Sequence, residues 1–138
     1  MRGRRIAFDY GDSRIGVAIC DPDGILASPL PFLDARHPKL LDQIAALLYE
    51  YEPIAIYVGE PKLLSGEAGT AVVKAREFVL TLRERFEIPV TLIDERLSTV
   101  DAARRLRDSG ISARDSKSLI DSMAAVSILE SGLSSEDR

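Results

Sequence analysis

The first third of the chain is divided into short apolar runs by connections of only four residues, and this spacing limits how the chain can fold. Both connections contain the Gly, Asp, Ser or Pro typical of turns. A connection this short joins antiparallel neighbours, because a parallel pair needs a crossover of about a dozen residues or more. We therefore expect an antiparallel three-stranded meander whose third strand ends at Pro29 and Pro31. The runs occupy residues 6–9, 15–20 and 25–30, and the connections occupy residues 10–13 and 21–24.

Beyond residue 37 the apolar pattern alternates between a helical period and continuous runs. Apolar residues that recur every three or four positions predict amphipathic helices. Continuous apolar runs of four or five residues predict strands that are buried on both faces. Helices are expected over residues 38–51, 72–86, 100–109 and from 115 or 116 to 132, and strands over residues 54–58 and 90–93.

This order of elements predicts an α/β fold with a mixed five-stranded sheet. The antiparallel meander would be extended by parallel strands through right-handed crossovers, and helices would flank the sheet. The chain has 138 residues, 46% of them hydrophobic, which is enough to bury a core without disulfides or a structural metal. No linker or repeat divides it, so we expect a single domain over residues 1–133 and a flexible C-terminal tail over residues 134–138.

Charge and cysteine content narrow the class of protein. The lone Cys20 lies between apolar residues and is expected to pack in the core. The sequence contains no membrane-spanning run and no signal peptide, so we expect a cytoplasmic protein without a membrane partner. The net charge of -4 argues against a protein that coats nucleic acid through bulk electrostatics. The charge is uneven, however, because residues 96–118 carry a local charge of +3.

Three carboxylates stand where a solvated charge is not expected. Asp9 ends the first strand, Glu95 follows the strand at residues 90–93, and Asp121 lies within the last helix. Burying a carboxylate is costly unless a cation or a metal ion pairs with it. Carboxyl ends of parallel strands meet at one edge of a sheet, where ligand sites lie, so Asp9 and Glu95 are expected there together. An oxygen-only cluster favours Mg²⁺ or Mn²⁺ over Zn²⁺.

Each of these carboxylates also has a simpler interpretation. Asp9 can cap the turn that follows it. Glu95 can pair with Arg96 on the surface, and Asp121 can pair with Lys117 one helical turn earlier. Taken singly, each acid is therefore open to a structural reading.

The stretch from residue 59 to residue 69 is expected to be a loop. Gly59 and Gly66 would let its backbone approach a phosphate closely, but glycines here can equally shape a strand-to-helix connection. The stretch is not a Walker loop, because the Gly-Lys-Ser/Thr ending is missing.

Four stretches resemble the successive motifs of the YqgF/RuvX family, the Holliday junction resolvases that are also described as pre-16S rRNA nucleases. They cover nearly the whole chain in order, and Asp-Glu-Arg-Leu-Ser-Thr is a distinctive motif. The resemblance implies an RNase H-like fold, divalent-metal-dependent cleavage of structured nucleic acid, and a role in processing the 5′ end of precursor 16S rRNA. The four stretches are residues 9–18, 58–61, 94–99 and 117–125.

The resemblance also assigns the acidic residues. Asp9, Glu95 and Asp121 match the acidic positions of the family. Glu60 is a departure, because the family usually has an apolar residue between the Gly and Pro of this motif. Since Glu60 lies at the end of a neighbouring strand, it is a possible fourth acid near the metal ions.

The implied mechanism is hydrolysis of a phosphodiester with two Mg²⁺ or Mn²⁺ ions, spaced about 3.5–4 Å apart. Asp9 would bridge the two ions, and the other two carboxylates would complete their shells. Lys117 would contact the scissile phosphate, and Arg14 or Arg96 would orient the nucleic-acid backbone.

Alternative functions stay open at this point. The chain can be a resolvase of four-way DNA junctions, or a non-catalytic module that binds RNA or ribosomes. An ATPase with two actin-like lobes is disfavoured, because 138 residues supply only one lobe. The expected partners are precursor rRNA or branched DNA, with ribosomal particles as further candidates, and the protein can be a monomer or a homodimer.

Overall fold

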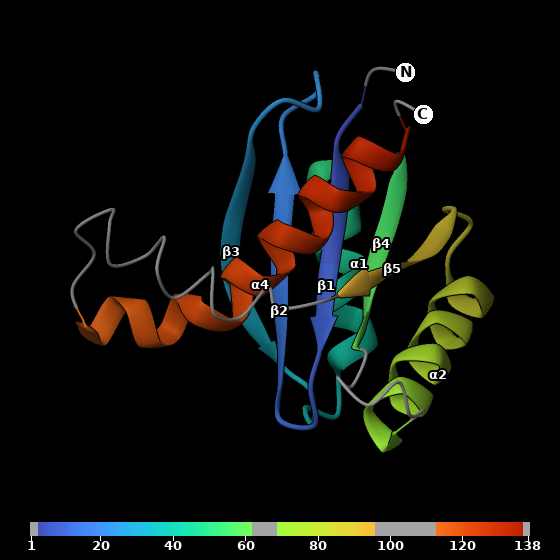
Figure 1. Cartoon of the computed structure of the whole chain (residues 1–138). Coiled ribbons are helices and arrows are strands. Elements are labelled where there is room, and N and C mark those ends of the chain that lie inside the picture. Colours follow the sequence, from blue (N-terminus) through green and yellow to red (C-terminus); the bar gives the residue numbers. More distant parts are fainter. Residues whose placement is uncertain (1–2, 62–68, 96–112, 137–138) are drawn as a thin grey trace.

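One mixed sheet of five strands forms the centre of the molecule (Figure 1). The computed structural model describes residues 3–61, 69–95 and 113–136, and for Pro61, Glu95 and residues 113–121 it describes the backbone alone. The strand order is β3-β2-β1-β4-β5, antiparallel among the first three and parallel from β1 through β4 to β5. The predicted mixed sheet is thus confirmed. Its strands are β1 (Arg5–Tyr10), β2 (Arg14–Cys20), β3 (Ala27–Asp34), β4 (Ala55–Pro61) and β5 (Val90–Glu95).

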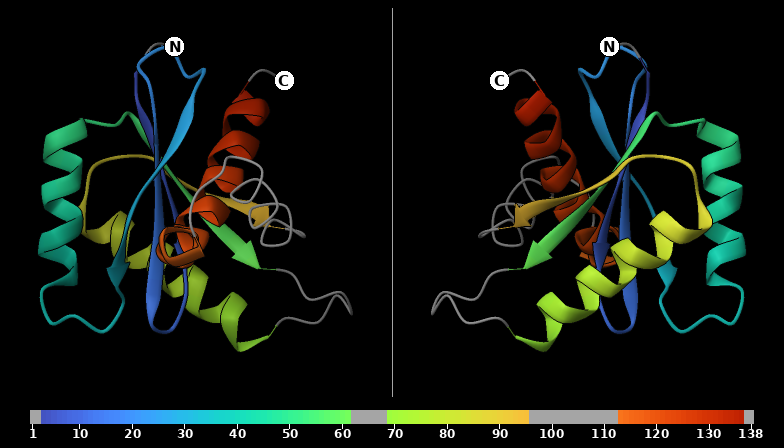
Figure 2. Two further views of the ribbon diagram at one scale, coloured as in Figure 1. Left: turned by 90° about the vertical axis from the view of Figure 1, so that its left-hand side faces the viewer. Right: turned by 90° about the vertical axis from the view of Figure 1, so that its right-hand side faces the viewer.

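Helices cover both faces of this sheet (Figure 2). Helices α1 (Leu40–Tyr51) and α2 (Thr70–Arg85) pack on one face, and α4 (Ala113–Glu136) packs on the other. The helix predicted over residues 100–109 lies outside the described residues. The described chain therefore forms three layers.

Alternate residues of each strand contribute to two separate cores. Phe8 of β1 and Val58 of β4 pack with α1 and α2, whereas Ala7 and Tyr57, one residue earlier in each strand, pack under α4. This follows from the two-residue period of a strand, which sends successive side chains to opposite faces. We call the two surfaces of the sheet the α2 face and the α4 face.

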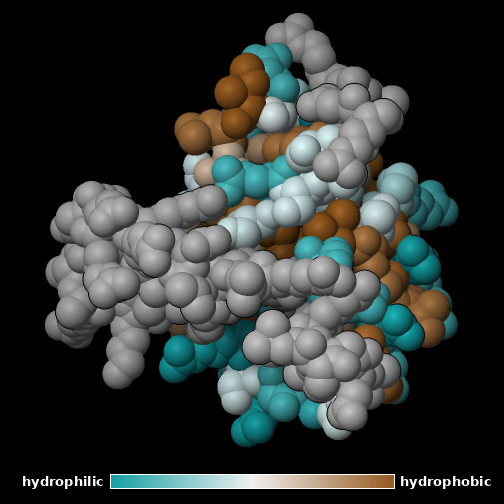
Figure 3. All heavy atoms as spheres, in the orientation of Figure 1, coloured by the Kyte–Doolittle hydropathy of each residue, from teal (hydrophilic) through white to brown (hydrophobic). Residues whose placement is uncertain are grey.

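The third strand begins later than predicted. Ile25 and Leu26 lie in the turn before β3, where their side chains are 82% and 66% exposed. Figure 3 shows hydrophobic residues at the surface in the upper part of the molecule. A carboxylate oxygen of Asp21 accepts hydrogen bonds from the backbone N–H groups of both residues, at 2.7 and 3.0 Å. These bonds hold both residues in the turn and lower the pKa of Asp21.

The same strand runs through the two prolines that were expected to end it. β3 is an edge strand, so one side of its backbone has no partner strand, and a proline is tolerated there. Pro29 pairs with Ala18, and the register with β2 shifts between Ile15 and Val17, opposite Pro31. This irregularity accommodates the residue that lacks an N–H.

The last helix also differs from its predicted bounds. It begins at Ala113 and continues past Gly132 to Glu136, so residues 134–136 of the expected tail are helical. Gly132 does not end the helix. It lets α4 approach β4, because a Cβ atom at this position would lie 2.5 Å from the ring of Tyr57.

The prediction that Cys20 packs in the core is confirmed. Cys20 is a free, buried thiol whose sulfur accepts a hydrogen bond from the Arg5 backbone N–H at 3.1 Å. Burial raises the pKa of this thiol. None of the described helices is both long enough and apolar enough to cross a membrane.

Candidate active site at the carboxyl edge of the sheet

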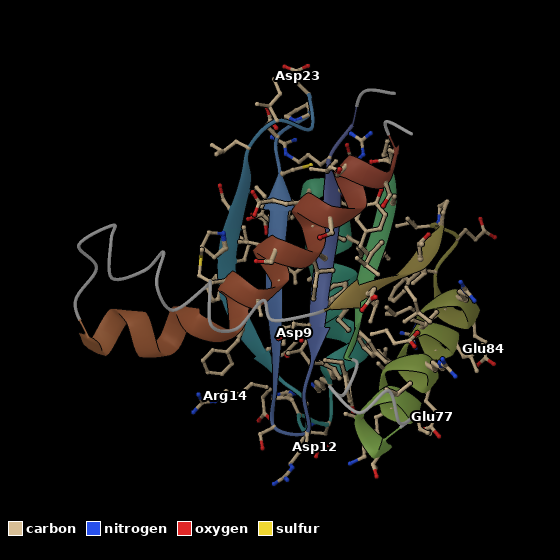
Figure 4. The ribbon with its side chains drawn as sticks, in the orientation of Figure 1. Asp9, Asp12, Arg14, Asp23, Glu77 and Glu84 are labelled. Atoms are coloured by element: carbon tan, nitrogen blue, oxygen red, sulfur yellow. The ribbon has the colours of Figure 1, made fainter. Side chains whose placement is uncertain are left out.

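Asp9 is the second-to-last residue of the central strand β1. It pairs with Gly16 of β2 and is half-buried. Asp9 follows Ala7 by two residues, and residues two apart in a strand lie on the same face, so Asp9 lies on the α4 face. Figure 4 shows Asp9 between α4 and the turn that joins β1 to β2, where Asp12 is labelled. The sequence thus placed this acid correctly at the carboxyl end of the first strand, one residue before that strand ends.

The neighbouring parallel strands end at the same edge of the sheet. β4 and β5 both extend further than predicted, because they remain paired up to Pro61 and Glu95. Gly59 was expected in a loop, but it is buried within β4 and pairs with Ile93. Gly66 lies outside the described residues. Gly59 therefore belongs to β4 and not to the predicted loop.

The structure separates Glu60 from Asp9. Glu60 follows Val58 by two residues and so belongs to the α2 face, opposite to the face of Asp9. Its carboxylate is paired there with Arg76 of α2 at 2.9 Å, and its side chain is only 14% exposed. Glu60 and Asp9 therefore end strands at the same edge of the sheet but lie on opposite faces, and Glu60 is paired with Arg76.

The backbones of the other predicted residues lie at or near this edge. Glu95 is the last residue of β5, and Ile93, two residues earlier in the same strand, packs with the α4 core. Asp121 lies in α4 directly before the buried Ser122, and Lys117 lies one turn earlier in the same helix. Arg96 lies outside the described residues. Asp9 and the end of β5 thus lie at the same edge of the sheet, and α4 covers the face on which Asp9 lies.

Arg14 is the first residue of β2. Its guanidinium lies over the ring of Phe32 of β3, 5.0 Å from the ring centroid, in a cation–π contact. Arg14 precedes Gly16 by two residues, and Gly16 pairs with Asp9. Arg14 therefore lies on the same face of the sheet as Asp9 (Figure 4). A positive group therefore stands at the turn next to Asp9, on the same face. Phe32 was not expected from the sequence, because its proximity depends on β3 continuing past Pro31.

A second ion pair links the β1–β2 turn to α2. Lys74 donates a hydrogen bond to Asp12 at 2.6 Å, and both side chains are exposed. This bond lowers the pKa of Asp12 and raises the pKa of Lys74. Together with the Arg76 pair it attaches the first turns of α2 to the carboxyl edge.

Ser122 is a residue near the site that sequence reasoning missed. It is fully buried, and its hydroxyl accepts a hydrogen bond from the Val17 N–H at 3.3 Å and donates one to the Leu30 carbonyl. The signal in the sequence is a polar residue within the buried stretch 122–126 of a helix. Its partners could not be found, because they belong to a register irregularity between two strands.

The fit of a metal ion rests on the type of ligand. Among the side chains that the structure describes, no three His, Cys, Asp or Glu residues form a cluster that could hold a metal. The side chains of Glu95 and Asp121 lie outside that set. Asp9 is a half-buried carboxylate at the end of a central strand, and oxygen ligands of this kind suit Mg²⁺ or Mn²⁺. The candidate ligands are thus all hard oxygen donors.

Comparison with known proteins agrees with this architecture. A family described as "RuvX: Holliday junction resolvase" matches residues 3–135. A protein of Streptomyces coelicolor, named "Putative pre-16S rRNA nuclease", is 47% identical over 137 residues, which cover 98% of this chain and 82% of that protein. A protein of Rhodococcus erythropolis with the same name is 49% identical over 143 residues, covering 99% of this chain and 81% of the relative.

A solved structure supports the fold alone. The RuvC protein of Thermus thermophilus, in complex with a Holliday junction substrate, aligns with a TM-score of 0.55 at 18% identity. The alignment covers 98% of this chain and 96% of that one. RuvC has the RNase H-like fold, so the predicted fold class is confirmed.

Proposed function

Because this chain belongs to the RuvX family, we propose that it is a metal-dependent nuclease that hydrolyses phosphodiester bonds of structured nucleic acid. The observation that carries the proposal is the position of Asp9, at the carboxyl end of the central strand and on the face that α4 covers. This is the edge at which open α/β sheets bind ligands. Glu95 ends β5, and Asp121 lies in α4, the helix that covers this face.

The proposed metal ligands are Asp9, Glu95 and Asp121. Two Mg²⁺ or Mn²⁺ ions held by these carboxylates would supply the positive charge that stabilises the transition state of phosphodiester hydrolysis. We exclude Glu60 from the set, because it faces α2 and is neutralised by Arg76. Asp9, on the central strand, would hold the ions together with the other two carboxylates.

The positively charged residues have a separate role. Arg14 stands at the turn next to Asp9 on the same face, where its guanidinium would bind a backbone phosphate of the substrate. Lys117 is proposed to contact the scissile phosphate, and Arg96 to orient the nucleic-acid backbone, as in the hypothesis drawn from the sequence. Gly66 is proposed to let the sugar–phosphate backbone approach closely.

Precursor 16S rRNA is the first candidate substrate. Relatives that are 47% and 49% identical over most of their length bear the name of a nuclease acting on it. Four-way DNA junctions are the second, because the family description names them. With either substrate we propose a cytoplasmic location, and with precursor rRNA we propose ribosomal particles as partners. Two symmetric cuts in a junction would require a homodimer, whereas processing of an rRNA end would not.

Cleavage of the two substrates side by side tests this proposal. The purified protein is incubated with precursor 16S rRNA and with a four-way DNA junction, in Mn²⁺, in Mg²⁺ and in a chelator. We expect cleavage of the rRNA with either ion and none in the chelator. Asp9→Asn is the control for contaminating nucleases, and its fold is checked by circular dichroism. Binding of both substrates without cleavage of either would instead support a non-catalytic module.

A further inference from the structure

A single buried hydroxyl joins α4 to two strands beside the proposed site. Ser122 is fully buried, accepts a hydrogen bond from the Val17 N–H of β2, and donates one to the Leu30 carbonyl of β3. Both partners are main-chain groups, so the contact fixes the helix relative to the sheet backbone. Buried polar groups are costly to leave unpaired, which makes this contact hard to replace by an apolar one.

The contact lies where the pairing of β2 and β3 is interrupted. Val17 pairs with Leu30 where the register of β2 and β3 becomes irregular, because Ile15 pairs with Leu33 rather than with the next regular position. Pro31, which lies within the irregularity, has no N–H to donate. The hydroxyl of Ser122 provides a donor and an acceptor where the ladder is interrupted.

We call this contact of Ser122 the anchor. It lies close to the proposed ligands both along the sheet and along α4. On the sheet, Val17 pairs with Phe8, and the next pair along the two strands is Gly16 with Asp9. On the helix, Ser122 directly follows Asp121. Figure 1 shows that α4 changes direction where it reaches β3, and its earlier turns extend beyond the sheet. Ser122 contacts Leu30 of β3 and Val17 of β2, and so holds α4 where the helix meets these strands.

We propose that Ser122 is a positioning residue, which sets the place of Asp121 relative to Asp9 by fastening α4 to the irregularity between β2 and β3. The inference rests on the proposed function, since it assumes that these two acids bind the same metal ions. It predicts that loss of the hydroxyl weakens metal binding more than an equal loss of stability elsewhere in the helix does.

Three variants separate positioning from a general effect on the fold. Ser122→Ala removes the hydroxyl. Ser122→Thr keeps it while adding a methyl group to a tightly packed position. Ile128→Val shortens another buried side chain of α4, one that packs only by apolar contact. The Thr and Val variants both disturb packing, but only the Ala variant removes the anchor.

Two measurements are made on each full-length variant. Hydrogen exchange by NMR reports the protection of the Val17 amide, and calorimetry reports the affinity for Mn²⁺ without nucleic acid. We expect Ser122→Ala to expose the Val17 amide and to weaken Mn²⁺ binding by about 10-fold or more, in the range found for groups that orient metal ligands. Ser122→Thr and Ile128→Val are expected to stay within about threefold of the parent protein.

The possible outcomes distinguish this inference from the proposed function. Mn²⁺ affinity that is equal in Ser122→Ala and Ile128→Val overturns the inference and leaves the function intact. A Val17 amide that exchanges equally in the parent and in Ser122→Ala overturns it as well. Mn²⁺ binding that is the same in the parent and in Asp9→Asn overturns the proposed function, and the positioning role falls with it.

Discussion

Asp9 and Glu60 end neighbouring parallel strands, yet they lie on opposite faces of the sheet. Asp9 shares its face with Ala7 and α4, whereas Glu60 shares its face with Val58 and is paired with Arg76 of α2. Because successive side chains of a strand lie on opposite faces, a shift of one residue along the strand decides which carboxylate can join the site. The sequence could not settle this, because residues 54–58 are apolar throughout and show no alternation from which a face can be assigned.

Tyr57 gives a prediction of pH dependence at the opposite end of the sheet. Burial and a hydrogen bond with Glu136 raise the pKa of its hydroxyl above the usual value near 10. In the unfolded chain the group ionises at about pH 10, whereas in the folded chain it stays neutral to higher pH. The free energy of unfolding should therefore be insensitive to this group below about pH 10 and should fall as the pH rises further.

Urea unfolding between about pH 8 and 11 checks this expectation. Tyr57→Phe should flatten the alkaline part of the profile, because it removes the ionising group. Tyr49→Phe is the matched control, since the Tyr49 side chain is 86% exposed. An alkaline slope that is unchanged in Tyr57→Phe would contradict this account of the Tyr57 pKa.

At the scale of the elements, most of the described fold could be predicted. The five strands, their pairing pattern and the helices α1, α2 and α4 follow from turn spacing and apolar period. The errors have physical causes that depend on tertiary structure. Proline ends a central strand but is tolerated in an edge strand such as β3, and the edge position is not visible in the sequence.

The candidate site could be predicted in part. The position of Asp9 followed from an apolar strand ending in an acid, and the edge it shares with β5 followed from parallel connections. Phe32 and Ser122 could not be found in this way. Both depend on the irregular pairing of β2 and β3, which brings β3 backbone and side chains to places that a regular ladder would not give.

The packing of α4 on β4 depends on Gly132. A Cβ atom at this position would lie 2.5 Å from the ring of Tyr57, so Gly132→Ala must push the helix from the sheet. We expect a loss of about 1–3 kcal/mol in the free energy of unfolding, as for other overpacked positions. Urea denaturation measures it, with Ser131→Ala at the neighbouring exposed position as control. A stability equal to that of the control would show that α4 and β4 are not in close contact there.

For the molecule as a whole, charge distribution matters more than net charge. The chain carries -4 overall, but residues 96–118 carry +3, and the remainder of the chain therefore carries -7. The proposed metal site adds positive charge at one edge. Such a protein would meet phosphates at one place rather than over its whole surface, which reconciles an acidic composition with a nucleic-acid substrate.

This distribution predicts how binding responds to ions. The affinity of the parent protein for precursor rRNA is measured with cleavage blocked by Ca²⁺. It should fall at least about tenfold between roughly 50 and 200 mM salt. Removal of divalent ions should weaken binding further, because the carboxylates would then repel phosphate. Tight binding in a chelator that does not change with salt would contradict this distribution of charge.

The central claim is that the site lies on the α4 face and contains Asp9 but not Glu60. Single-turnover cleavage of precursor 16S rRNA by Asp9→Asn and Glu60→Gln tests it most directly, because both changes replace one carboxylate by an amide at the same sheet edge. Asp9→Asn should lose at least about a hundredfold in rate, beyond the ~10–100-fold typical of groups that only support a ligand. Glu60→Gln should stay within about threefold of the parent. A fully active Asp9→Asn, or a Glu60→Gln as impaired as expected for Asp9→Asn, would contradict the assignment.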